Sequence, residues 1–136
     1  MSSKLYEHRD LVIEEGKHVR ELVFFHVGVC HLYKTTKIAG ESMRLKVVTL
    51  KIGGWFGDYQ IMLDLPSTWD LEAGSDKEFK NKHKINFMPP DHIMVYKIEA
   101  DRFKRIIDQH PAMRSMVVTR SLFRRAYFMK TFKDNK

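Results

Sequence analysis

The chain has 136 residues, which is enough for one domain around a single hydrophobic core. Its longest apolar run, residues 22–25, is far shorter than the ~20 residues that cross a bilayer, and no stretch has the order of a signal peptide. The net charge of +7 first suggests nucleic acid, but seven Lys or Arg against one acid lie between residue 112 and the end. A basic segment of this kind suits an acidic partner or a membrane leaflet equally well, so nucleic acid is not the expected partner.

Short strands are expected over most of the first hundred residues. β-branched and aromatic residues predict strands at 11–13, 22–33, 45–52, 69–73 and 92–98. Gly28, within the second of these, indicates a bulge or a close backbone approach. Residues 34–42 predict a hairpin connection, and residues 74–86 predict a polar, lysine-rich loop.

Two helices are expected after residue 100. Asp101 is predicted to cap the first, which runs to His110. Its buried face is expected to comprise Phe103, Ile106 and Ile107. Pro111 ends that helix and can open the second, over 112–132. The second helix carries an apolar stripe made of Met113, Met116, Val117, Phe123 and Tyr127. Further apolar side chains lie off this stripe, so the helix needs more than one packing partner.

A glycine-rich segment followed by a short apolar run bears most directly on function. Gly53-Gly54-Trp55-Phe56-Gly57-Asp58 precedes the apolar run 59–65, which is too short for its period to separate helix from strand. Backbone N–H groups beside such glycines can cradle a phosphate, and Asp58 could accept a ribose hydroxyl. The same residues also fit a glycine-rich hairpin followed by a helix-capping aspartate. Taken alone, the segment leaves both interpretations open.

Six pieces, in the correct order, resemble the cyclic-nucleotide-binding domain family. They are residues 10–16 (DLVIEEG), residues 22–29 (LVFFHVGV), Phe56-Gly57-Asp58, the set Pro66, Thr68 and Ala73, residues 92–103, and residues 122–125 (LFRR). The third piece stands where the family has Phe-Gly-Glu at the start of its phosphate-binding cassette, and the last resembles the end of the family's lid helix. The resemblance implies one domain over 1–136 that is mainly β with C-terminal helices: a β-roll, or jelly roll, over about 8–100 and helices over about 101–133.

The resemblance also implies a ligand pocket. Its expected residues are Gly57, Asp58, Tyr59 and Gln60 on the backbone and ribose side, Ser67 and Thr68 on the phosphate side, and Val47 with Arg120 or Phe123 around the base. The ligand would be cyclic AMP, cyclic GMP or a nucleoside. No metal and no further cofactor are expected.

Two departures from the family's cassette bear on that pocket. Ser67 replaces the arginine that pairs with the cyclic phosphate in the family, and a charge-assisted contact of this kind is worth roughly 1.5–3 kcal/mol. Asp58 replaces a glutamate and is one methylene shorter. Trp69 and Asp70 stand where the family prefers small residues, so we expect the pocket to be partly filled or unfavourable for an anion.

These features predict a non-enzymatic regulatory domain of a longer protein, with weak or lost cyclic-nucleotide binding. By resemblance it would be the cytoplasmic gating module of an ion channel, since ether-à-go-go type potassium channels keep this fold without responding to cyclic nucleotides. Ligand binding in the family pulls the lid helix over the pocket and passes the movement to an effector. Two alternatives stay open: a structural or interaction subunit with the same fold, and a nucleoside sensor. A kinase regulatory subunit is less favoured, because no inhibitor-like Arg-Arg segment precedes the domain.

Histidine and cysteine give no sign of a metal site or a nucleophile. His26 and His31 are five residues apart in a predicted strand, and the other histidines are scattered over turns and ends. Cys30, the single cysteine, fits a reducing compartment such as the cytoplasm and predicts a small core residue. The sequence motifs of serine hydrolases, P-loop proteins and kinases do not occur in the chain.

Overall fold

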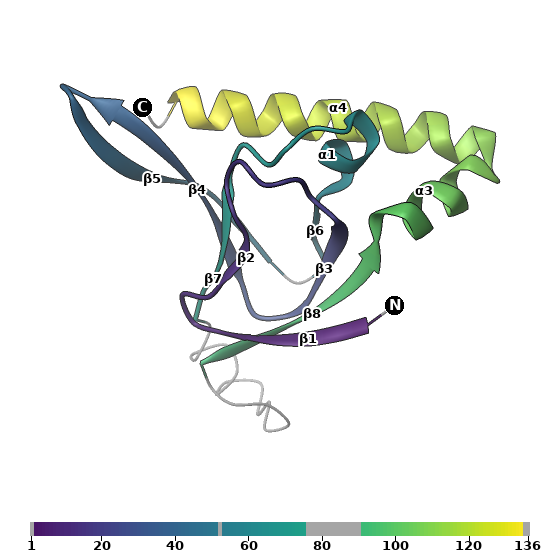
Figure 1. The fold of residues 1–136 in the computed structure, drawn as a ribbon, viewed down its shortest axis with the longest axis horizontal. Helices are drawn as coiled ribbons and strands as arrows, with labels where there is room; N and C mark the ends of the chain where they lie inside the picture. Colours follow the sequence, from purple (N-terminus) through teal and green to yellow (C-terminus); the bar gives the residue numbers. More distant parts are fainter. Residues whose placement is uncertain (1, 52, 76–90, 135–136) are drawn as a thin grey trace.

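The computed structural model describes residues 2–51, 53–75 and 91–134, and its strands form two antiparallel sheets that close into a β-roll (Figure 1). The first sheet has the order β1-β8-β3-β6, with bounds Ser2–Glu7, His92–Glu99, Glu21–Val27 and Trp55–Phe56. The second sheet has the order β2-β7-β4-β5, with bounds Leu11–Ile13, Asp70–Ala73, Cys30–Ile38 and Glu41–Leu50. The predicted fold class, mainly β with C-terminal helices, is confirmed.

The main hydrophobic core lies between the two sheets. Side chains of a strand point alternately to its two faces, so the inward positions of both sheets meet in one cluster. The fully buried members with the largest side chains are Trp69, Phe56, Leu32, Leu71, Ile93, Val23 and Val95. Each such aliphatic or aromatic side chain stabilises the fold by about 1.5–3 kcal/mol relative to an exposed position.

Gly28 separates two strands where the sequence predicts one strand over 22–33. The chain reverses there, so that β3 joins the first sheet and β4 joins the second. Gly28 has a φ of +97°, and a Cβ at this position would lie 2.5 Å from the Cγ2 atom of Ile93. Only glycine combines this conformation with so close a neighbour. The predicted close approach is confirmed, whereas the single continuous strand is wrong.

The boundaries of two other elements differ from the prediction. β4 continues to Ile38 and turns at Ala39 and Gly40, so the predicted connection over 34–42 is mostly strand. β1 was not predicted, yet it pairs with β8 along its whole length, and the roll therefore begins at Ser2 rather than near residue 8. Only Tyr6 of β1 is buried, which is why the strand shows no alternation in the sequence.

Three helices complete the described part of the chain: α1 (Asp58–Leu63), α3 (Ala100–Asp108) and α4 (Pro111–Asp134). The apolar run after Gly57, which the sequence left unassigned, is thus helical. α3 continues directly from β8, and α4 then runs back along one side of the molecule and packs on α1 (Figure 1). Among the described residues, no helix combines the length and apolarity needed to cross a membrane. Most of the predicted loop at 74–86 lies outside the described residues.

The structure corrects two details of the predicted helices. Glu99, rather than Asp101, occupies the N-cap of α3, and no side chain caps the helix; Asp101 lies in the first turn, where a negative charge favours the helix dipole. Ile107 is buried as expected, but Ile106 is exposed. The predicted apolar stripe of α4 is largely exposed, because the helix turns Ser121 and Phe128 toward the roll instead.

Candidate functional site

Gly57 sets the start of α1 at the candidate site. Its φ of +109° is a conformation that residues with a side chain rarely adopt. A Cβ at Gly57 would lie 3.0 Å from Val19 Cγ1 and 3.1 Å from the carbonyl oxygen of Glu21, so the position also has little room. The turn at Gly57 brings Asp58, the first residue of α1, beneath α4.

Asp58 is bound by two residues of α4. Its side chain is almost fully buried, with the residue 4% exposed. Its carboxylate accepts one hydrogen bond from Ser121 Oγ at 3.0 Å and another from Arg124 Nη1 at 2.5 Å. We call Asp58, Ser121 and Arg124 the polar latch. The carboxylate that the resemblance assigns to a ribose is therefore occupied by side chains of α4.

Arg124 extends the polar latch to a third element. Its guanidinium also donates to the carbonyl oxygen of Trp55 in β6. The guanidinium carbon lies 4.8 Å from the centroid of the Trp55 ring and 5.3 Å from that of Phe128, within the range of cation–π attraction. Charge-assisted hydrogen bonds and ring contacts together fix one orientation of this side chain. Arg124 thus joins α4 to both β6 and α1.

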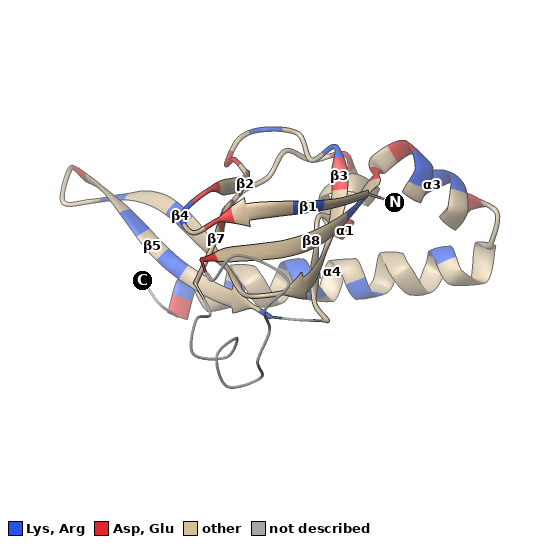
Figure 2. Cartoon of the chain, turned by 90° about the horizontal axis from the view of Figure 1, so that it is seen from below, with Lys and Arg blue, Asp and Glu red and all other residues tan. Residues whose placement is uncertain are grey.

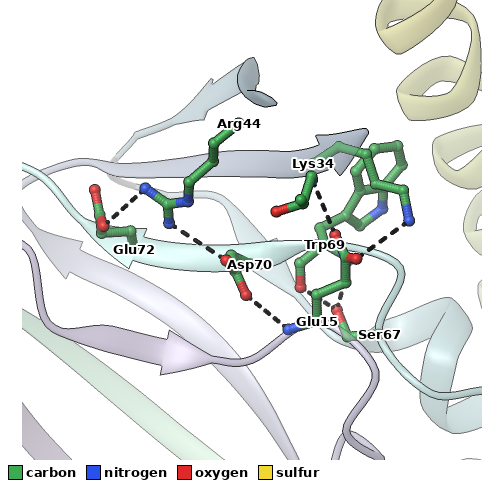
Figure 3. A network of polar contacts seen from close by, with 8 residues as sticks. Glu15, Lys34, Arg44, Ser67, Trp69, Asp70 and Glu72 are labelled. Carbon is green, nitrogen blue, oxygen red and sulfur yellow. Dashed lines mark hydrogen bonds and ion pairs between the residues drawn. The ribbon is translucent and has the colours of Figure 1, made fainter. Parts of the chain in front are cut away.

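Ser67 forms a tight local turn and is itself buried. Its hydroxyl donates to the carbonyl oxygen of Trp69 at 2.6 Å and accepts from the Trp69 N–H at 3.2 Å (Figure 3). Such serine turns replace backbone hydrogen bonds at a change of chain direction. The residue at the phosphate-binding arginine position of the family therefore shapes the backbone here, and the turn directs Trp69 inward.

Trp69 fills the space between the roll and α4. It is 1% exposed, and its indole N–H donates to the Tyr59 hydroxyl at 2.7 Å. Its ring centroid lies 6.4 Å from that of Phe128 and 5.9 Å from that of Phe132, both edge-on. Tyr59 in turn lies 6.3 Å from Phe128. We call Tyr59, Trp69, Phe128 and Phe132 the aromatic cluster, and its geometry is the favourable one for aromatic pairs.

Burial raises the pKa of the Tyr59 phenol above its usual value, although the hydrogen bond from Trp69 opposes the shift. The phenol therefore stays neutral at physiological pH and accepts the indole N–H as an uncharged partner. Its neutrality suits the apolar surroundings of the aromatic cluster, where an ionised oxygen would be costly.

Asp70 is held by a separate polar network on the other side of β7. Arg44 donates to Glu72 at 3.1 Å and to Asp70 at 3.4 Å, while the backbone N–H of Glu15 donates to Asp70 at 2.7 Å (Figure 3). The Arg44 guanidinium also lies 3.9 Å from the ring centroid of Tyr33. Arg44 thus neutralises the carboxylate of Asp70, and the contacts of Asp70 hold the start of β7 in place.

The remaining residues that the resemblance places in the pocket contribute less to the contacts beneath α4. Gln60 is buried, and neither atom of its side-chain amide has a hydrogen-bond partner in the described part of the chain. Thr68 is exposed. Val47 is buried in the same core cluster as Trp69 and Tyr59. The structure therefore brings Asp58, Tyr59 and Ser67 to the underside of α4, and Val47 into the core beneath them.

Arg120 and Phe123, the alternatives for the base side, lie next to different cavities. Phe123 borders a groove of about 470 Å³ between α4 and the end of β5. That groove is lined by Val48, Thr49, Leu50, Gly54, Trp55, Phe123, Arg124, Tyr127 and Phe128. Arg120 borders a smaller pocket of about 200 Å³ with Phe24 and Phe103, on the side of α4 that faces α3. Both cavities border the polar latch, because Arg124 lines the groove beside Phe123 and Asp58 lines the pocket beside Arg120.

A further cavity, of about 650 Å³, lies away from the aromatic cluster. It is formed by the end of α1, the residues before β3 and the start of α3, and charges of both signs line it. Trp69 and the other members of the aromatic cluster do not border it. Of the residues that the resemblance places in the ligand pocket, Gln60 alone lines this cavity.

Sequence reasoning expected Arg120 or Phe123 of α4 at the site, but it missed the α4 residues that contact Asp58 and Trp69. Ser121, Arg124 and Phe128 lie on one face of a helix that is apolar on several sides, so no single stripe identifies the face that packs. Ser121 lies three residues before Arg124, and Phe128 lies four residues after it, so all three side chains share one face of a helix. This spacing was the signal in the sequence that could have identified them. A buried acid in the cassette needs a partner, and this spacing was the place to look for it.

Metal and thiol chemistry have no support in the described residues. Within them, no cluster of three or more His, Cys, Asp or Glu side chains could hold a metal ion. Cys30 is buried, and burial raises the pKa of its thiol to about 12. The thiol is therefore protonated and a weak nucleophile, as expected of a core cysteine.

Comparison with solved structures identifies proteins that share this fold. No protein family matches the sequence, and no curated protein is significantly similar to it. Among solved structures, the catabolite activator protein of Thermus thermophilus is 14% identical, with a TM-score of 0.69 over 98% of this chain and 53% of that one. The regulatory domain of Toxoplasma gondii PKA, solved with cAMP, is 12% identical, with a TM-score of 0.65 over 88% of this chain and 38% of that one.

A third structure is the regulatory subunit of a cAMP-independent protein kinase A from Trypanosoma brucei, in a mutant form bound to cAMP. It is 15% identical, with a TM-score of 0.58 over 76% of this chain and 31% of that one. The chain thus spans between 31% and 53% of the length of these three structures. At such identities the likeness shows the fold alone, a β-roll followed by C-terminal helices that this chain shares with the three structures.

Proposed function

We propose that this chain is a regulatory domain of the cyclic-nucleotide-binding type whose lid helix is held closed by its own side chains. The observation that carries the proposal is Trp69, which fills the space beneath α4 and contacts Phe128 and Phe132. In the family that the sequence resembles, a small residue at this place leaves room for the cyclic phosphate. Cyclic nucleotides would therefore bind weakly or not at all.

The polar latch supports the same proposal from the ribose side. Asp58 accepts hydrogen bonds from Ser121 and Arg124, so a ribose hydroxyl would have to displace a charged partner. The buried turn at Ser67 supports the proposal from the phosphate side, because the serine supplies no positive charge to pair with a cyclic phosphate. Two polar contacts of the family ligand are thus replaced by contacts within the chain.

The domain would act by population shift rather than as an enzyme. The closed position of α4 is the ground state, and any partner that binds the open position better shifts the balance toward it. We propose that this partner is an effector domain or another subunit of a longer protein, and that this protein is an ion channel whose cytoplasmic part contains this domain. The basic side chains along α4 fit such a place near an anionic membrane surface (Figure 2).

A nucleoside sensor is the second candidate function. The groove of about 470 Å³ beside the aromatic cluster is lined mainly by apolar and aromatic side chains, including Trp55, Phe123 and Tyr127. Its size and lining suit a planar, uncharged ligand better than a cyclic phosphate. This candidate keeps the same lid helix but gives it a ligand.

Calorimetric titration with cyclic AMP, cyclic GMP and adenosine at physiological salt tests the proposal. We expect no binding heat from either cyclic nucleotide with the natural chain. The double variant Ser67→Arg with Trp69→Ala restores both the positive charge and the space, and we expect it to bind cyclic AMP at least tenfold more tightly than the single variant Trp69→Ala.

Each titration outcome has a distinct meaning. A micromolar dissociation constant for a cyclic nucleotide with the natural chain would refute the closed-lid proposal. Binding of adenosine alone would favour the nucleoside sensor. Circular dichroism of the double variant is the control for folding, because Ser67 and Trp69 are both buried.

A further inference from the structure

Gln60 carries a buried amide that the described part of the fold leaves without a hydrogen bond. The residue is 1% exposed, and neither Nε2 nor Oε1 has a partner among the described residues. Burial of an amide without hydrogen bonds costs free energy, and such groups are rare in folded proteins. Its oxygen can accept hydrogen bonds and its nitrogen can donate two. Gln60 therefore has both an unused donor and an unused acceptor.

The same residue lines the cavity of about 650 Å³ at the end of α1. The connection before β3 and the first turn of α3 complete the walls, with residues that include His18, Val19 and Ala100. The volume lies within the usual range of small-molecule sites. No member of the polar latch or of the aromatic cluster lines this cavity. A ligand bound here would therefore leave the contacts beneath α4 in place.

Positive charge is available at the α3 side of the cavity. Arg20 and Lys104 both line it, and neither forms an ion pair with any described residue. The carbonyl oxygen of Arg20 accepts the N–H of Ala100 at 2.8 Å, so Arg20 lies beside the first turn of α3. Glu99 and Asp101 also line this side, but the positive end of the helix dipole offsets part of their charge. Arg20 and Lys104 can thus attract a carboxylate.

Negative charge is available at the α1 side of the cavity. Asp64, the C-cap residue of α1, lines the cavity and forms no ion pair with any described residue. Glu21 also lines it, but this acid is already paired with Lys97 at 3.5 Å. Asp64 is therefore the acid that an ammonium group could meet. The cavity offers opposite charges from two different elements.

We propose that this cavity binds a short peptide with free termini. A peptide unit presents one N–H and one C=O, which are the donor and the acceptor that the Gln60 amide lacks. The terminal ammonium would pair with Asp64, and the terminal carboxylate with Arg20 and Lys104. A free amino acid carries the same two charges but no peptide unit, so it would leave the amide of Gln60 unmatched. This site is separate from the closed lid and does not depend on it.

Two-dimensional ¹H–¹⁵N NMR of the purified chain tests the site, with alanyl-alanine as the probe. We expect a saturable shift of the side-chain NH₂ signals of Gln60. The signals of exposed Gln109 and of the Trp69 indole N–H should stay in place. Alanine lacks the peptide unit and N-acetylalanine methylamide lacks both charges, so each should bind at least tenfold more weakly. Unchanged Gln60 signals, or equal binding of either reference compound, would overturn the inference.

Gln60→Met tests whether the amide serves a ligand rather than the fold. Methionine is similar in length but has no amide to leave unpaired. We expect it to raise the midpoint of thermal unfolding of the free chain by about 3–5 °C and to abolish the stabilisation by alanyl-alanine. Gln109→Met is the matched control, because this exposed glutamine should change neither quantity. A lower midpoint with unchanged peptide binding would contradict the inference.

Lys104→Glu tests the charge at the α3 side. The substitution places a negative charge where the peptide carboxylate would lie, so we expect alanyl-alanine to bind at least fivefold more weakly. Arg105→Glu is the matched control, since Arg105 is the next residue of α3, is exposed and does not line the cavity. Equal weakening by both variants would show that the net charge of the chain, rather than this site, governs binding.

Discussion

Replacing Trp69 with alanine is expected to lower the free energy of unfolding by about 3–5 kcal/mol, the largest effect of any single substitution in the candidate site. Trp69 is fully buried, and its removal leaves a cavity bordered by Phe128 and Phe132. The hydroxyl of Tyr59 also loses its indole donor. Urea denaturation followed by fluorescence and circular dichroism measures the change.

Trp69→Phe provides the graded control for that measurement. Phenylalanine keeps most of the aromatic contact with Phe128 but cannot donate to Tyr59, so we expect a loss of about 1–2 kcal/mol. If Trp69→Ala cost less than about 1 kcal/mol, the aromatic cluster would not be what holds α4 to the roll.

Arg124→Gln is expected to destabilise the fold by about 3 kcal/mol, because it leaves the carboxylate of Asp58 buried without its counter-ion. The effect lies at the lower end of the range for a buried pair, since the Arg124 side chain keeps some contact with water. We expect the C-terminal half of α4 to lose its protection from hydrogen exchange before the strands of the roll do.

Arg125→Gln is the matched control for the polar latch. Arg125 is the next residue along the same helix, has the same side chain and is exposed. Its substitution is expected to change the unfolding free energy by less than about 0.5 kcal/mol. Equal effects of the two glutamine variants would show that general charge on α4, rather than the contact with Asp58, governs stability.

The polar latch and the aromatic cluster act on the same half of α4, but they do so differently. The aromatic cluster supplies non-directional burial, which holds the helix against the roll. The polar latch supplies directional contacts that set the rotation of the helix about its axis, because Ser121 and Arg124 must both reach Asp58. A partner that opens the lid would have to replace both kinds of contact.

The sequence allowed most strands and the turn at Gly57 to be predicted because their signals are local, and the resemblance then implied the β-roll. Strand composition, the glycines at turns and the order of Phe56-Gly57-Asp58 and Pro66 are each readable within a few residues. The turn at Gly28 escaped prediction because apolar side chains continue on both sides of it, so composition shows no break between β3 and β4.

The contacts of α4 could not be predicted from the same signals. Which face of the helix meets the roll depends on where β6 and α1 lie, and those positions result from pairings between distant strands. Ser121 and Arg124 became identifiable only once Asp58 was placed under the helix. Trp69 was recognised as bulky for its position, but its contact with Phe128 requires the three-dimensional arrangement.

Hydrogen–deuterium exchange of α4 in the natural chain, with and without millimolar cyclic AMP, tests the closed-lid account most directly. The account predicts that residues 121–132 are as well protected without nucleotide as the strands of the roll, and that cyclic AMP leaves their exchange unchanged. Rapid exchange of this segment without nucleotide, slowed when cyclic AMP is added, would show a ligand-closed lid and contradict the account.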